Sequence, residues 1–525
     1  MASSTLTRLP PELVALVLFY LANRDIKNLR LTCGFFRDPA HLRFTRVFLS
    51  PNPLNISVFR AIADHETLRR GVREIIWDDA RLTPEDDDSS SCFDEDFEVH
   101  NASPSAGVPR WFAGACKVNI GEFWNRKGKD VDTAEQAARA QQVEFQLPLR
   151  QSWLYYQALL EQEQEVAATG ADIDALRHGL QRFSSLKIIT ITAAAHGVLY
   201  NPLYETPMIR AFPNGFNYAL PGGWLRPDDG DPSPTAYSWE NEVMKHKWRG
   251  YRVITRELAQ QEHQISEFIV DAHLMDTGLN CRIFDRPCEE YNNLVTILRR
   301  PGFKRIDLDL MVGGQHYEGW PSFRRGLIGR ALGEATDLEH VNVRTNVVSD
   351  LDGRALQTGS GGSINHHIPL RSIFPTDKWS KLRHLGLSGF LVQQADVLSL
   401  LASLPQTIRS VELSFLYFLE GGGNYRDLLV DMRDNLDWRH RAEDARPKVT
   451  IGVYPLIQRE FRAIWVDREV DDFLYRDGEN PFGYDDESLN QVSYGNGTVR
   501  DAFDPAYERP WLCYHDYKRL GYYQR

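Results

Sequence analysis

The hexapeptide Leu382-Arg-His-Leu-Gly-Leu387 carries the pattern that decides the fold of this chain. Its apolar residues stand at the first, fourth and sixth positions. Side chains alternate between the two faces of a strand, so Leu385 and Leu387 would lie on the same face. A single short strand cannot bury that face by itself, and it therefore needs similar strands beside it.

The same L-x-x-L-x-L pattern recurs along the chain, and it is typical of the strands of leucine-rich repeats. Val449 and Ile451 indicate one last strand with the same alternation of apolar residues. Stacked side by side, such strands bury one continuous apolar face. The six full matches are Val72/Ile75/Trp77, Leu186/Ile189/Ile191, Phe303/Ile306/Leu308, Leu338/Val341/Val343, Leu382/Leu385/Leu387 and Ile408/Val411/Leu413.

The spacing of the six matches is uneven. Only the last two are separated by the roughly 20–29 residues of a leucine-rich repeat, with an amphipathic helix predicted over Ala395–Leu404 between them. We also expect helices over Gln261–Leu279 and Glu289–Arg300. The sequence thus favours an irregular repeat array with long insertions. An ordinary α/β domain whose strands happen to read alike remains the alternative.

The amino-terminal stretch Leu9–Asp38, LPPELVALVLFYLANRDIKNLRLTCGFFRD, has more apolar residues than a short segment can bury. Pro11 suits the first turn of a helix, and Glu12 suits its positive end. From Leu13 to Leu21 the helix would be apolar on nearly every side, which requires more than one partner surface. A segment of about 40 residues cannot cover such a surface alone.

This stretch resembles an F-box, the helical module that docks a substrate receptor onto the Skp-family adaptor of a cullin–RING ubiquitin ligase. The chain has Ala22-Asn23 where the family usually has Asp-Pro, Thr32 for the usual Val, and Gly34 for a usual basic residue. The matching positions are Leu9-Pro10-x-Glu12-Leu13, Leu16, Leu21, Asp25, Leu29-Arg30-Leu31-x-Cys33 and Phe36-Arg37-Asp38.

The resemblance implies a non-catalytic receptor that binds the adaptor, and through it cullin, while the rest of the chain holds an unknown protein substrate. Two alternatives stand beside it. The helices could be the first layer of the domain that follows, or the chain could be an interaction scaffold outside the ubiquitin pathway. The expected adaptor-binding residues are Leu9, Pro10, Pro11, Glu12, Leu13, Leu16, Val17, Leu21 and Leu29.

Composition limits the partners and the compartment. The formal net charge is −12, which argues against a nucleic-acid partner held by bulk electrostatics. No apolar run approaches the roughly 18 residues of a membrane span, so we expect no membrane partner. The 6 cysteines are scattered without a CxxC pair, which is typical of reduced thiols in a cytoplasmic or nuclear protein.

No set of residues predicts catalysis, a metal or a cofactor. His366 and His367 with His273 lack the spacing of a metal site. Ser388 stands in Gly-Leu-Ser-Gly-Phe, where a hydrolase nucleophile elbow needs a final glycine, so a serine hydrolase is a weak third hypothesis. The acidic run Glu85–Glu98, in the predicted loop Pro84–Gly107, has no rigid ligand spacing.

The sequence therefore predicts an α/β chain in three parts. Residues 1–50 form the F-box module, residues 51–465 an irregular leucine-rich-repeat-like body with inserted loops and helices, and residues 466–525 a polar, aromatic extension packed on that body. The fold class is a helical F-box followed by an irregular repeat solenoid with long insertions. No enzymatic activity and no cofactor are expected.

Overall fold

A computed structural model describes residues 7, 9–37, 39–83, 107–225, 234–347, 365–455, 461–485 and 488–523. The fold is α/β, as expected, and is built on one large sheet in which every strand pair is parallel. A short strand, β5 (Leu279–Asn280), pairs with β6 beside the main row. The main row, in spatial order, is β1 (Arg46–Leu49), β2 (Glu74–Asp78), β3 (Ile188–Thr192), β4 (Glu267–Asp271), β6 (Arg305–Met311), β7 (His340–Thr345), β8 (His384–Ser388), β10 (Ser410–Ser414) and β12 (Lys448–Thr450).

Each of the six predicted patterns forms a strand of this sheet, and their apolar residues are in register. Val341 of β7 lies opposite Leu385 of β8, which lies opposite Val411 of β10. Leu385 and Leu387 are fully buried. Adjacent strands thus bury one another's apolar face, which is worth roughly 1.5–3 kcal/mol for each large side chain.

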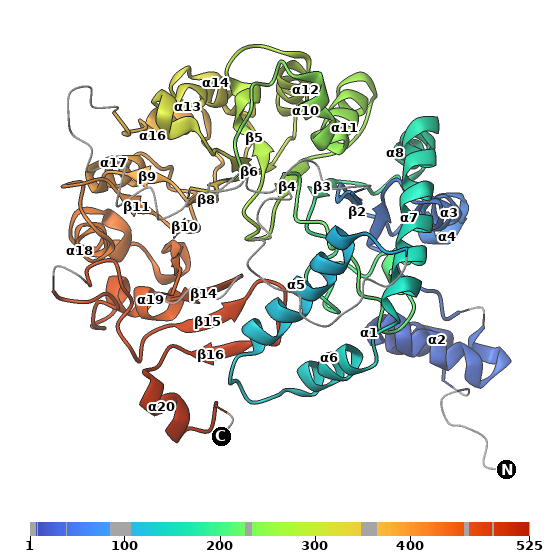
Figure 1. Ribbon diagram of the computed structural model, residues 1–525. Helices are drawn as coiled ribbons and strands as arrows, with labels where there is room; N and C mark the ends of the chain where they lie inside the picture. The colour runs from blue at the N-terminus through green and yellow to red at the C-terminus, as the bar shows by residue number, and fades with distance from the viewer. Residues whose placement is uncertain are drawn as a thin grey trace.

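Helices cover the apolar face on the outside of an arc, and the strands line its inside (Figure 1). Two small strands, β9 (Leu391–Val392) and β11 (Tyr417–Phe418), pair with each other between the strand ends and the helices. The main covering helices are α3 (Pro53–Asp64), α8 (Ala171–Arg182), α11 (Arg249–Gln260), α12 (Glu289–Leu298), α14 (Leu327–Gly333), α17 (Gln394–Ala402), α18 (Tyr425–Asn435) and α19 (Asp467–Tyr475). Shorter helices are α4 (Glu66–Arg69), α9 (Pro207–Arg210), α10 (Glu242–Lys245), α13 (Pro321–Arg324) and α16 (Leu370–Ile373).

The helix predicted over Gln261–Leu279 is wrong, because this segment contains β4 and ends at β5. Ile265, Phe268 and Val270 are buried and repeat the L-x-x-L-x-L pattern, with the β-branched residues that strands favour. The helix predicted over Glu289–Arg300 is confirmed by α12, and the one over Ala395–Leu404 by α17.

The insertion between β2 and β3 reaches across the open side of the arc. It contains α5 (Arg110–Lys127), α6 (Ala134–Glu144) and α7 (Leu149–Thr169), with a small aromatic core around Phe112, Trp153 and Tyr156. Opposite stands an antiparallel sheet of β13 (Gly452–Val453), β14 (Arg462–Trp465), β15 (Thr498–Asp501) and β16 (Glu508–Pro510), followed by α20 (Tyr514–Arg519). Figure 1 shows α5, α6 and this sheet filling the gap between the two ends of the arc.

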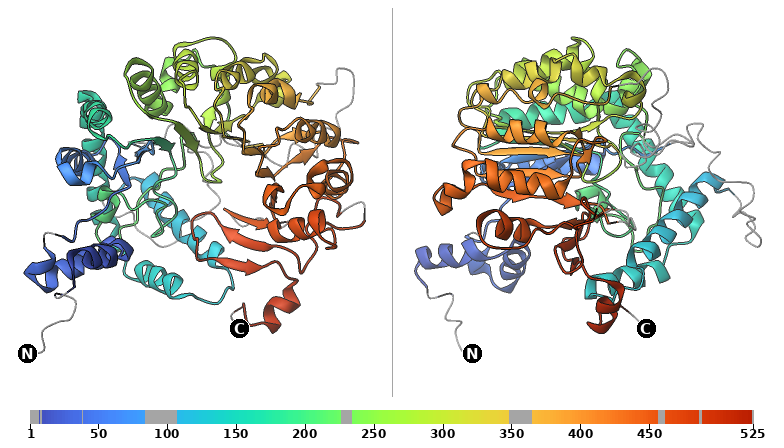
Figure 2. Two further views of the ribbon diagram at one scale, coloured as in Figure 1. Left: turned by 180° about the vertical axis from the view of Figure 1, so that it is seen from behind. Right: turned by 90° about the vertical axis from the view of Figure 1, so that its left-hand side faces the viewer.

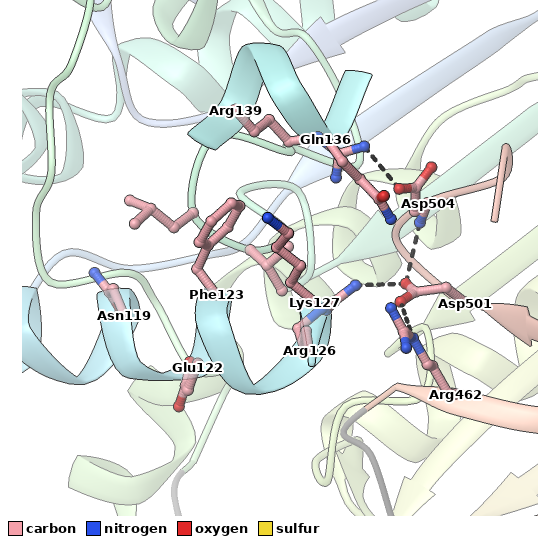
Figure 3. Close-up of a pocket in the computed structure, with 12 residues that line it drawn as sticks. Asn119, Glu122, Phe123, Arg126, Lys127, Gln136, Arg139, Arg462, Asp501 and Asp504 are labelled. Carbon is pink, nitrogen blue, oxygen red and sulfur yellow. Dashed lines mark hydrogen bonds and ion pairs between the residues drawn. The ribbon is translucent and has the colours of Figure 1, made fainter. Parts of the chain in front are cut away.

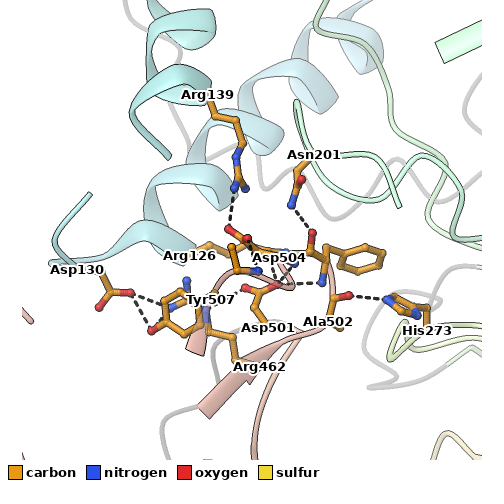
Figure 4. A network of polar contacts seen from close by, with 12 residues as sticks. Arg126, Asp130, Arg139, Asn201, His273, Arg462, Asp501, Ala502, Asp504 and Tyr507 are labelled. Carbon is orange, nitrogen blue, oxygen red and sulfur yellow. Dashed lines mark hydrogen bonds and ion pairs between the residues drawn. The ribbon is translucent and has the colours of Figure 1, made fainter. Parts of the chain in front are cut away.

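A buried polar network joins the insertion to the carboxy-terminal sheet (Figure 4). Asp501 accepts hydrogen bonds from Arg462 at 3.0 Å and from Arg126 of α5 at 2.5 Å, and its side chain is 1% exposed. Arg462 also donates to Asp130 at 3.1 Å, and Arg139 of α6 donates to Asp504 at 2.7 Å.

Two side chains that follow strands of the large sheet also contact backbone carbonyls of the carboxy-terminal segment. The side chain of Asn201, after β3, donates to the carbonyl oxygen of Phe503, and the ring of His273, after β4, contacts the carbonyl oxygen of Ala502. Segments separated by 375 residues, Arg126 and Asp501, therefore become direct neighbours.

Strand pairing crosses two predicted boundaries, those after residues 50 and 465. Strand β1 pairs with β2, so residues 46–49 are part of the large sheet. The carboxy-terminal sheet begins at β13, before residue 466, and its strands pair from β13 through β16. Residues 84–106, which make up nearly all of the predicted acidic loop, lie outside the described residues.

The network predicts which arginine matters for stability. We expect Arg462→Gln to lower the free energy of unfolding by about 3–5 kcal/mol, because it removes the one guanidinium that bonds both buried carboxylates, those of Asp501 and Asp130. The matched control is Arg500→Gln, in which an ion pair with Glu508 is lost from a side chain that is 46% exposed. This control should lower the free energy of unfolding by at most about 1 kcal/mol, as measured by urea unfolding. Equal losses for the two variants would contradict a stabilising role of the buried network.

Candidate functional site

The amino-terminal helices form a small unit with its own core. Helix α1 (Pro11–Tyr20) begins at a proline, and α2 (Asn23–Thr32) follows after an extended Leu21 and Ala22. Val14 and Leu18 of α1 are buried against Ile26 of α2 and Phe36 of a short 3-10 turn. This core is separate from the large core under the sheet, so most of the surface of the unit is left uncovered by the body.

Arg43 fixes the angle between the two helices and the body. Its guanidinium donates to the carbonyl oxygens of Phe19, at 2.5 Å, and Leu21, which are among the free carbonyls at the end of α1. Its backbone N–H donates to the Asn23 side chain at 2.9 Å, and Asn23 donates back to the Arg43 carbonyl at 2.6 Å. Because β1 starts at Arg46, this clamp ties the helical unit to the edge of the sheet.

A broad apolar surface of the unit faces outward. Leu16 is 52% exposed and Leu31 is 86% exposed, although both are large aliphatic side chains. Several large apolar side chains exposed on so small a unit are typical of a site of protein contact. The exposed large apolar side chains of the unit are Leu13, Leu16, Val17, Phe19, Tyr20, Leu31 and Phe35.

The nine residues predicted to bind an adaptor divide into two groups. Leu9, Leu21 and Leu29 are half-buried against the small core, where they support the helices. The other six are exposed on the first turns of α1 and the residue before it: Pro10, Pro11, Glu12, Leu13, Leu16 and Val17. Sequence reasoning placed all nine in one set, because a helix that is apolar on every side gives no clue to which side faces inward. It also left out Phe19, Tyr20, Leu31 and Phe35, whose exposure only the tertiary structure shows.

A small cavity lies between α5, α6 and the carboxy-terminal sheet (Figure 3). Its volume is about 40 Å³, enough for a few waters and far below the roughly 300–1,000 Å³ of a small-molecule site. The charged groups that line it, including Arg126, Arg139 and Asp501, already bond one another across it. The geometry favours a structural role.

A buried polar cluster lies where β2 and β3 end. The Nδ1 atom of His196 is 2.5 Å from the hydroxyl of Tyr218, and its Nε2 atom is 3.9 Å from the carboxylate of Asp78. Burial raises the pKa of Asp78 to about 8 and lowers the pKa of His196 to about 4. Both groups are therefore neutral near pH 7. All three side chains are buried, so no substrate can reach them and the cluster serves the fold.

The residues considered for catalysis or metal binding lie apart and have ordinary roles. Ser388 is the last residue of β8 and is 1% exposed, which excludes it as an open nucleophile. His367 contacts Asp396 at 2.8 Å, His366 accepts from Trp320 at 3.3 Å, and His273 contacts Ala502. Among the described residues, no group of three or more His, Cys, Asp or Glu could hold a metal ion.

The large sheet carries polar side chains on the face opposite its core. Asp307 accepts from Arg305 at 2.5 Å and lies 3.0 Å from the Nε2 atom of His340. The ring of His340 stacks on His384 at 4.0 Å between centroids. Burial, with the charge of neighbouring His340, lowers the pKa of His384 to about 3, so its ring is neutral. This face is polar and paired along its middle.

A scan against protein-family models finds no match for this chain, and a search of curated proteins finds no similar sequence. Across the described part of the chain, no helix is long and apolar enough to cross a bilayer.

The buried cluster predicts a pH dependence of stability. Asp78 has a raised pKa, so the folded chain keeps a proton that the unfolded chain loses above about pH 4. Stability from this group is therefore highest at low pH and falls by about 1.4 kcal/mol per pH unit until about pH 8. We expect Asp78→Asn, which mimics the neutral acid, to gain up to about 3 kcal/mol relative to the wild type between pH 5.5 and 7.5. Urea unfolding at both pH values measures this gain.

The control is Asp377→Asn, which removes a carboxylate that is 73% exposed. Its difference from the wild type should stay constant across the same pH range. A constant difference for Asp78→Asn as well would show that this carboxyl is ionised in the folded chain.

Proposed function

We propose that this chain is a substrate-recognition subunit of an SCF-type cullin–RING ubiquitin ligase. The amino-terminal unit docks onto a Skp-family adaptor, and the body holds a target protein. The chain itself contributes no chemistry. It brings the target close to the catalytic subunits, which raises the effective concentration of the two reactants.

The observation that carries this proposal is the exposed apolar surface of α1 and α2. Leu13 and Leu16 stand at positions that match the F-box pattern, and with Val17 they are exposed, away from the small core formed by Val14 and Leu18. A soluble unit that leaves seven large apolar side chains exposed is stabilised when a partner covers them. The resemblance in sequence and the exposed surface therefore support the same partner.

The architecture of the body supports a binding role. We infer that it is an irregular leucine-rich-repeat-like solenoid, because strands with the same apolar pattern stack in one curved parallel sheet with helices outside. Solenoids of this kind present extended surfaces for partners. The long insertions account for the uneven spacing of the strands along the sequence.

The docking surface predicts a specific loss of binding. We expect the double variant Leu13→Glu/Leu16→Glu to weaken adaptor binding about a hundredfold or more, because burying each leucine is worth roughly 1.5–3 kcal/mol. Both side chains are about half exposed, so the fold should tolerate the change. Titration of purified chain against a Skp-family adaptor by calorimetry measures the affinity.

The matched control is Leu154→Glu on α7, where the leucine is 56% exposed but far along the chain from the docking unit. It should bind the adaptor as the wild type does. Reconstitution with adaptor, cullin and RING subunit then separates the receptor from a scaffold, because a receptor supports ubiquitin transfer and a scaffold does not. An intact chain that never binds the adaptor would overturn the proposal.

A further inference from the structure

Basic side chains form a row along the amino-terminal ends of the strands of the large sheet. The residues at the starts of neighbouring strands are joined by backbone hydrogen bonds. The N–H of Lys187 donates to the carbonyl oxygen of Arg73 at 2.9 Å, and the N–H of Arg409 donates to that of Arg383 at 2.8 Å. We call this set the basic row. Its members are Arg73, Lys187, Lys304, Arg383, Arg409 and Lys448, and all six are exposed.

The acidic residues along the row are already paired, some of them with members of the row itself: Asp467 lies 3.9 Å from Lys448. Glu339, which stands between Lys304 and Arg383 in the row, binds Lys304 at 2.7 Å, and Asp337 binds Lys381 at 2.6 Å. Within the part of the chain that the structure describes, the guanidinium of Arg383 has no hydrogen-bond or ion-pair partner. The guanidinium of Arg409 bonds, among the same described residues, to the carbonyl oxygens of Gln406 and Ile408 alone.

Repulsion between neighbouring cations of the row lowers the stability of the fold, and a bound anionic ligand would relieve it. Neighbouring strands are about 4.8 Å apart, and like charges side by side on them repel. The chain as a whole has a formal net charge of −12, so cations are in the minority. An open depression of about 260 Å³ lies at Arg383 and Arg409, with Lys381, Thr407 and Glu339 around it.

We propose that the basic row binds an extended acidic segment of a protein, rich in Asp and Glu, which lies across the ends of the strands. Planar guanidinium groups match carboxylates with two parallel hydrogen bonds. From β2 to β12 the row crosses seven strand-to-strand steps, or roughly 34 Å, which an extended peptide of about ten residues spans. Duplex DNA has one negative charge per roughly 1.7 Å, so a chain with a net charge of −12 repels it more strongly than a short acidic peptide.

The position of the basic row fits the proposed function. The role of the row as the target-binding site rests on that proposed function. Arg73 donates its backbone N–H to Thr45 at 2.8 Å, directly after the Arg43 clamp, so the row starts beside the docking unit. In the right-hand view of Figure 2 the amino-terminal helices lie at one end of the strands, and α5 to α7 lie at the other end. A target on the basic row would therefore lie on the same side as the adaptor.

The test uses the full chain without an adaptor and a fluorescein-labelled peptide of about twelve residues with alternating Glu and Ser. Fluorescence anisotropy gives the affinity at about 50 and 200 mM salt. We expect binding that weakens with salt, and a loss of at least about tenfold for Arg383→Glu/Arg409→Glu. Arg383→Gln/Arg409→Gln should show a smaller loss in the same direction. The matched control, Arg110→Glu/Arg150→Glu, changes two exposed arginines at the starts of α5 and α7 and should stay within about twofold of the wild type.

Each other outcome overturns the proposal. Equal losses for both double Glu variants would mean that only net charge matters, and no binding by the wild type would mean that the row is not a peptide site. Tighter binding of a single-stranded RNA of about the same length would assign the row to nucleic acid. Adaptor titration on the same preparations is independent of these results, so failure of the basic row and failure of the docking surface are distinguished.

Discussion

The body of this molecule depends on the mutual burial of its parallel strands. A strand such as β8 has one apolar face, and its backbone groups need partners on both edges. Leu385 is buried only because β7 and β10 stand in register beside it and helices cover the face. No strand is stable alone, and the long insertions are tolerated because they enter and leave between strands without breaking that register.

An arc built in this way has two ends, and a buried network of arginines and aspartates joins the segments that fill the gap between them. Arg462 and Asp501 are almost fully buried and bond each other, and Arg126 and Asp130 complete the set from an insertion far away in the sequence. Removing such charges from water is expensive, so the network stabilises the closed form only when it is complete. The paired groups also explain why the cavity between them is too small for a ligand.

The two proposed binding surfaces lie where this pattern of mutual burial stops. The amino-terminal helices bury Val14 and Leu18 but leave Leu16 exposed, and at the starts of the strands Arg383 and Arg409 have no acidic partner among the described residues. Apolar surface without cover and cations without counter-charges are each stabilised by a partner of matching chemistry. A receptor needs two such surfaces, one for the adaptor and one for the target.

The sequence alone determined the α/β class, the strands at its six apolar patterns and the surplus of apolar residues on the first helices, because these follow from local periodicity. It missed β4, although Ile265, Phe268 and Val270 carry the same pattern. Only the tertiary structure decided which side of α1 faces outward, which arginines meet Asp501, and that Arg73 and Arg409 belong to one row. The first depends on packing against Ile26 and Phe36, and the other two depend on contacts between segments hundreds of residues apart. Local periodicity contains no information about either.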